Sequence, residues 1–127
     1  MEKKLWIDTM KQALLEALER LNSEVAGLQE SRHSDTKSSA GDKHETGRAM
    51  LDQELAQLRQ QLEKTKRLRS DLSGIPEGVF SSAQWGAAVE TERMVYFISI
   101  SHGKVEAAGS KPVYALSPVS PAAQEMM

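Results

Sequence analysis

Apolar residues recur along the first thirty residues at the spacing of an amphipathic helix. They stand three or four positions apart, at Ile7, Met10, Leu14, Leu18, Leu21, Val25 and Leu28. An average step of about 3.5 residues is the repeat of a coiled-coil seam. Charged residues such as Glu16, Glu19 and Glu24 fall between these positions. The pattern therefore predicts a long helix with one apolar stripe and a solvated opposite face.

A second apolar stripe with similar spacing occupies residues 51–72. Its positions are Leu51, Leu55, Leu58, Leu62, Leu68 and Leu72, with a polar interruption at Thr65. Each stripe is too narrow to stand alone, so we expect the two helices to fold back on each other as an antiparallel hairpin. The alternative is a parallel coiled coil between two chains. The polar stretch at residues 31–43 favours the hairpin, because it interrupts a continuous helix.

The pattern changes character after residue 72. Residues 73–127 hold all four prolines and five of the six aromatic residues. Nearly every position over residues 94–100 is apolar. Since successive side chains of a strand point to opposite faces, this predicts a central strand covered on both faces. A turn at residues 101–104 and a short strand at residues 113–116 follow. Ser120 and Pro121 predict the capped start of a short helix.

Together these elements predict an α+β fold. An antiparallel coiled-coil hairpin occupies residues 1–72, with its tip at residues 31–45. Residues 73–78 have the composition of a linker. A small, mostly antiparallel β domain occupies residues 79–127.

Composition narrows the chemistry that the chain can perform. The 127 residues include no cysteine and three histidines, and the net charge is −2. Without cysteine there is no disulfide scaffold, zinc–thiolate site or cysteine nucleophile, so oxygen ligands are the main option for a metal. No apolar run approaches the ~18 residues of a membrane span, and no secretion signal is recognisable. We therefore expect no membrane partner and a cytoplasmic location.

The tip of the predicted hairpin carries two carboxylates at helical spacing. Ser39 can cap the second helix with Asp42 three residues later, and Asp42 and Glu45 then lie in the first turn. One interpretation is that the two carboxylates only stabilise the helix, because the helix macrodipole favours negative charge in the first turn. The other is half of a magnesium site, because magnesium prefers oxygen ligands and commonly takes the remainder from phosphate or another protein.

Four segments resemble the Gre family of bacterial transcript-cleavage factors. Residues 41–45, Gly-Asp-Lys-His-Glu, match the family's Gly-Asp-x-x-Glu pattern at the start of the second arm. Residues 79–90, VFSSAQWGAAVE, are similar to its first strand, and residues 96–101, YFISIS, to a central strand. Residues 115–121, ALSPVSP, are similar to its Ser-Pro turn before a short helix.

The resemblance implies a transcription elongation factor that binds RNA polymerase. The family joins an N-terminal antiparallel coiled coil to a C-terminal domain of FKBP-like fold. Its coiled-coil tip enters the polymerase secondary channel and stimulates cleavage of backtracked RNA. Asp42 and Glu45 would be the catalytic and metal-binding residues, sharing magnesium with the polymerase near the 3′ end of the nascent RNA. The chain would be an accessory factor and not itself an enzyme, with no small-molecule substrate.

Two departures from the family keep other functions open. Residues 31–50 carry four basic and three acidic side chains, so the tip has mixed charge. This charge suits a secondary-channel regulator without cleavage activity, and a coiled-coil adaptor or structural protein is the third reading. The family's domain continues beyond the position of Met127, so we expect a shortened domain or a piece of a longer product.

Further residues have both a structural and a functional interpretation. Lys64, Lys66, Arg67 and Arg69 form a basic cluster on the second helix. They are either a solvated helix face or a contact for RNA phosphates or polymerase acids, with affinity that falls as salt rises. The aromatic residues Trp85 and Tyr96 are expected in the core, with interaction anchors as the alternative.

Overall fold

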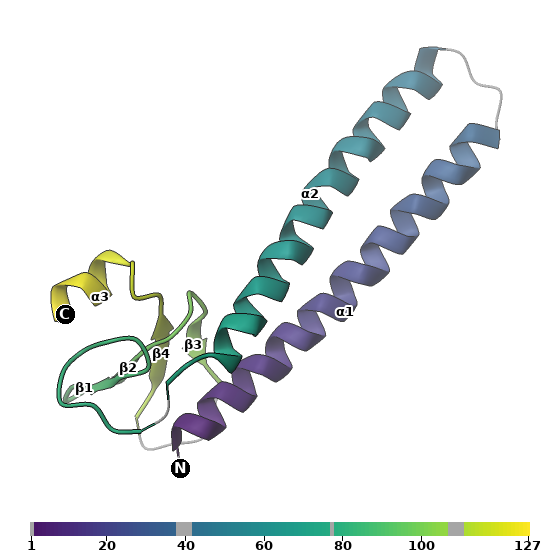
Figure 1. Cartoon of the computed structure of the whole chain (residues 1–127). Coiled ribbons are helices and arrows are strands. Elements are labelled where there is room, and N and C mark those ends of the chain that lie inside the picture. The colour runs from purple at the N-terminus through teal and green to yellow at the C-terminus, as the bar shows by residue number, and fades with distance from the viewer. Residues whose placement is uncertain (1, 38–41, 77, 107–110) are drawn as a thin grey trace. The chain divides into compact units, whose positions relative to one another are not determined.

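The computed structural model describes residues 2–37, 42–76, 78–106 and 111–127; the side chains of residues 2 and 32–46 lie outside this description. Within these ranges the fold is α+β, with two long helices followed by a small mixed sheet of four strands and a short helix (Figure 1). The elements are α1 (Glu2–Lys37), α2 (Asp42–Ser73), β1 (Ala88–Glu90), β2 (Val95–Ile98), β3 (Gly103–Val105), β4 (Val113–Leu116) and α3 (Pro121–Met126).

The chain divides into two compact units. One consists of Leu15–Lys66, and the other joins Met1–Leu14 to Arg67–Met127. Within its described residues, the first unit therefore contains only helix. The second combines the beginning of α1 and the end of α2 with all four described strands and α3.

The two apolar stripes predicted from the sequence are confirmed as the inward faces of α1 and α2. Every predicted stripe position is buried or half-buried, whereas Glu16, Glu19 and Glu24 are exposed. The helical backbone also reaches further than the stripes do, because α1 continues to Lys37. Thr65 does not interrupt α2, since its hydroxyl donates a hydrogen bond of 2.7 Å to the carbonyl oxygen of Gln61.

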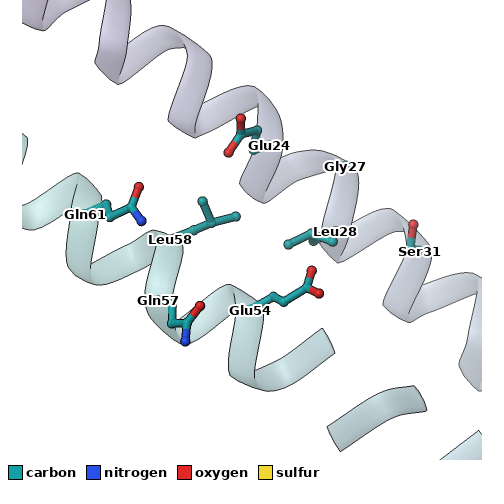
Figure 2. A pocket seen from close by; sticks show the side chains of 8 residues that line it. All are labelled: Glu24, Gly27, Leu28, Ser31, Glu54, Gln57, Leu58 and Gln61. Atoms are coloured by element: carbon teal, nitrogen blue, oxygen red, sulfur yellow. The ribbon is translucent and has the colours of Figure 1, made fainter. Parts of the chain in front are cut away.

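In the helical unit, segments of α1 and α2 from one chain lie side by side and run in opposite directions (Figure 2). Leu21 on α1 and Leu55 and Leu62 on α2 are its buried side chains. Burying a leucine contributes about 1.5–3 kcal/mol. The unit is therefore held by a narrow row of leucines.

The sheet of the other unit has the strand order β1-β2-β4-β3. β1 pairs with β2 and β3 pairs with β4 in antiparallel fashion, but the central pair β2–β4 is parallel, with Tyr96 opposite Tyr114. Two of the three pairings are antiparallel, as expected, and the parallel central pair makes the sheet mixed. The cause is that β3 lies outside β4 instead of between β2 and β4, so the chain crosses over before it forms β4.

The two faces of the sheet border different clusters. Val95 and Phe97 point to the larger one, which they share with Trp6, Met10 and Leu72. Its remaining buried members are Leu14, Ile75, Ile100, Val105, Val113 and Ala115. The helix ends thus cover one face of the sheet within this unit. The prediction that residues 94–100 form a central strand is confirmed for Val95–Ile98, after which the chain bends.

On the opposite face, Ile98 and Leu116 pack with Ala123 of α3. The capped start of α3 is confirmed, since the Ser120 hydroxyl accepts a hydrogen bond of 3.2 Å from the Ala123 amide and Pro121 is the first helical residue. The strand predicted at residues 113–116 is also confirmed. The predicted turn at residues 101–104 is shorter, because β3 already begins at Gly103, whose φ is +94°.

The segment before β1 is fixed to this unit by a few specific contacts. The Trp85 Nε1 donates a hydrogen bond of 3.1 Å to the Ser99 carbonyl oxygen. The Lys3 ammonium lies 4.9 Å from the centre of the Phe80 ring, and partial burial lowers the pKa of Lys3. The start of α1 and the chain before β1 are thus joined by a cation–π contact.

Candidate functional site

Of the Gly-Asp-Lys-His-Glu pentad at residues 41–45, the last four residues open α2, which begins at Asp42. Glu45 follows one helical turn later on the same helix. Ser39, the expected cap, and Gly41 lie outside the described residues, and so do the side chains of Asp42 and Glu45. The backbone therefore places Asp42 and Glu45 in the first turn of α2, and the pairing of their carboxylates stays a prediction.

The four residues of the predicted basic cluster on α2, Lys64, Lys66, Arg67 and Arg69, are all exposed. Lys64 and Lys66 belong to the helical unit, and Arg67 and Arg69 belong to the unit with the sheet. Lys66 lies 3.7 Å from the carboxylate of Glu63, an exposed pair whose expected stabilisation is about 0–1 kcal/mol. These side chains are accessible to a polyanion, and their role in contacting RNA or polymerase stays a prediction.

A groove opens between α1 and α2 within the helical unit, at a point that the sequence did not single out. Its volume is about 460 Å³, and it is open to solvent. Figure 2 shows Leu28 and Leu58 pointing toward one another from the two helices. The other lining residues are Glu24, Gly27, Ser31, Glu54, Gln57 and Gln61. Both leucines are only half-buried, so the seam between the helices is incompletely closed here.

The groove follows from side-chain size and chemistry. Gly27 precedes Leu28 and has no atom within 4 Å of the place where a Cβ would lie. The rim residues Glu24 and Glu54 are charged and exposed. A missing side chain beside a stripe position is a sequence signal for such a gap. The groove is thus lined by two apolar side chains, Leu28 and Leu58, and by charged and polar side chains from both helices.

His102 lies in the predicted turn, directly before β3, and is half-buried. Partial burial lowers the pKa of its imidazole, because the charged form loses hydration. The nearby Ser99 is buried, and its hydroxyl donates a hydrogen bond of 3.2 Å to the Phe97 carbonyl oxygen. Ser99 is therefore a satisfied polar group of the sheet.

The described residues contain no group of three or more His, Asp or Glu side chains arranged to hold a metal ion. Among the helices in the described ranges, none has the length and apolar character that crossing a membrane requires. Comparisons of the chain with protein-family models, with curated proteins and with solved structures find no match.

Proposed function

We propose that the chain is an accessory factor of bacterial RNA polymerase, of the kind that the Gre resemblance implies. The observation that carries the proposal is the position of Asp42 and Glu45, because both lie in the first turn of α2, the second of two antiparallel helices. A helical hairpin can carry a pair of carboxylates into a narrow channel. The proposed place of action is the cytoplasm.

In this proposal the two long helices form an antiparallel coiled coil that enters the secondary channel of the polymerase. Asp42 and Glu45, one helical turn apart, fit a magnesium ion by the chemistry of their oxygen donors. The ion would be shared with the polymerase, and two metals stabilise both the attacking and the leaving oxygen of a phosphodiester displacement. The residues of this chain would hold the ion and orient a water at the 3′ end of backtracked RNA.

The remaining parts of the chain would position the hairpin. The small sheet with α3 is proposed as an FKBP-like domain that docks on the polymerase surface. Lys64, Lys66, Arg67 and Arg69 are exposed and would contact RNA phosphates or acidic residues of the polymerase. The chain would contribute to cleavage without a complete active site of its own.

The test is cleavage of nascent RNA by stalled elongation complexes in the presence of the purified chain. We expect cleavage to be stimulated, and Asp42→Asn and Glu45→Gln each to reduce the stimulation at least about tenfold, as loss of a metal ligand or its support commonly does. Glu54→Gln, which neutralises an exposed carboxylate elsewhere on α2, is the matched control. Unchanged stimulation in both tip variants would remove the two carboxylates from the mechanism.

The mixed charge of residues 31–50 favours a second candidate function. Four basic and three acidic side chains there suit a regulator that occupies the secondary channel without supplying metal ligands. Polymerase binding without any stimulation of cleavage would select this function. Failure to capture polymerase, together with a concentration-dependent dimer, would instead select a coiled-coil adaptor.

A further inference from the structure

The sheet has an open aromatic surface that the proposed polymerase function does not use. Tyr96 on β2 and Tyr114 on β4 are directly opposite each other in the register of the two central strands. Their neighbours Val95, Phe97, Val113 and Ala115 point into the larger core cluster. Side chains alternate between the faces of a strand, so both tyrosines belong to the other face, the one that α3 covers only in part.

The tyrosine rings are held in place but accessible. Tyr96 is half-buried and packs against the cluster of Ile98, Leu116 and Ala123, whereas Tyr114 is 43% exposed. Their ring centres are 6.4 Å apart with an edge-to-face inclination of 66°. In that arrangement the two rings do not stack face to face on each other, and the exposed part of Tyr114 is accessible to a ligand.

A lysine, Lys104, lies next to the exposed Tyr114 in the sheet. Lys104 on β3 is paired with Tyr114 in the strand register and is exposed. It makes no ion pair among the described residues, whereas Lys111 is bound to the Glu90 carboxylate at 3.1 Å. Glu106, just past β3, is the nearest acidic residue along the same strand, and His102 is half-buried at the other end. The surface thus combines aromatic faces with one available positive charge.

We propose that Tyr96, Tyr114 and Lys104 form a binding platform for single-stranded nucleic acid. Aromatic side chains on the central strands of a sheet stack on unpaired bases, and a neighbouring cation binds the backbone phosphate. The opposite face of this sheet is packed on the helix ends, so the platform rests on a rigid support. The inference is independent of the polymerase proposal, because it involves other residues and needs no polymerase for its test.

Because the platform has a single cation, the salt dependence of its affinity should differ from that of the basic cluster on α2. Neutralising one phosphate on a single strand gives a slope of log affinity against log salt of roughly −0.7, and four phosphates would give roughly −2.8. Stacking contributes little to this slope. Binding at the platform should therefore depend strongly on the aromatic rings and weakly on salt.

The test is fluorescence anisotropy of the full chain with labelled eight-nucleotide oligo(U) and oligo(dU) over a range of salt concentrations. We expect Tyr114→Leu to weaken binding about fivefold or more, the loss typical of one stacked base. Tyr114→Phe keeps the ring and should bind as the unaltered chain does. Lys104→Gln should flatten the salt dependence. Val119→Ser, at a position that is 81% exposed and outside the platform, is the control.

The two oligonucleotides distinguish a preference for RNA from binding of single strands in general. Tighter binding of oligo(U) would assign the platform to RNA through its 2′-hydroxyl groups, and equal binding would assign it to single strands in general. Three results would overturn the proposal: no binding by the unaltered chain at low salt, binding that Tyr114→Leu leaves unchanged, or binding lost only when Lys64, Lys66, Arg67 and Arg69 are replaced by Gln. Weaker capture of polymerase by Tyr114→Leu, with oligonucleotide affinity unchanged, would mark the face as a protein contact and would also overturn it.

Discussion

At Gly86 the backbone has a φ of +92°, and a Cβ added there would lie 2.9 Å from the carbonyl oxygen of Pro76. The amide of Gly86 also donates a hydrogen bond of 2.7 Å to the Ile98 carbonyl oxygen, so the backbone cannot move away freely. We predict that Gly86→Ala lowers the free energy of unfolding by about 1–3 kcal/mol. Urea denaturation measures the change.

Gly27 provides the matched control for that substitution. It lies within α1, and nothing is within 4 Å of its added Cβ. Gly27→Ala should therefore raise the free energy of unfolding by about 0.5–1 kcal/mol, because alanine restricts the unfolded chain and favours helix. Equal effects of the two substitutions would contradict the described backbone at Gly86.

His102 makes the stability of the chain depend on pH. Partial burial lowers the pKa of His102 below its usual value of 6.5, so the unfolded state binds its proton more readily. The stabilisation from the neutral imidazole is complete above pH about 6.5 and is lost as the pH falls toward the lower folded-state pKa. Between pH 7 and pH 5 the free energy of unfolding should fall further for the unaltered chain than for the His102→Gln variant. Parallel losses in both proteins would contradict this.

At the scale of the helices, the hairpin seam should be uneven in strength. Leu55 is buried at 4% exposure, whereas Leu58 lines the groove and is half-buried. Leu55→Ala should lower the free energy of unfolding by about 2–5 kcal/mol, and Leu58→Ala should cost clearly less, because part of its surface already meets water. Denaturation of both variants measures the difference. Equal costs would mean that the groove closes in solution.

The sequence predicted the helices better than the sheet, for physical reasons. A helix is specified by local periodicity, so the apolar stripes and the cap at Ser120 could be read directly. Strands of three or four residues carry little periodic signal, and β3 overlaps a stretch with turn composition at Gly103. Strand order is set by tertiary contacts, and so the pairing of Tyr96 with Tyr114 and the exposure of Tyr114 could not be predicted.

At the scale of the whole molecule, the pattern shows which face of a helix is apolar but not what that face packs against. Trp6 and Met10 were recognisable as apolar positions, yet nothing in the sequence placed them beside Phe97. The pentad at residues 41–45 could be placed at the start of the second helix, because two stripes flank it. Gly27 beside Leu28 is a sequence signal for a gap, but the size of the groove could not be predicted, since it depends on how Leu28 and Leu58 meet.

The shared core of the helix ends and the sheet is directly testable. The rings of Trp6 and Phe97 have centres 5.3 Å apart, and both residues are buried. A double-mutant cycle with Trp6→Leu and Phe97→Leu should give a coupling energy of about 0.5–1.5 kcal/mol, as aromatic pairs commonly do. Thermal or urea unfolding supplies the four values. Additive effects would show that the end of α1 does not pack on the sheet in solution.

The most direct test of the polymerase proposal asks whether the start of α2 reaches the RNA 3′ end. A photoreactive amino acid at Arg48, an exposed position near the start of α2, would be irradiated in stalled elongation complexes carrying 3′-labelled RNA. The same group at Val79, which is 94% exposed and distant in sequence, is the control. The account predicts label transfer to the chain from position 48 and none from position 79. Stable binding to polymerase with no transfer from position 48 would contradict it.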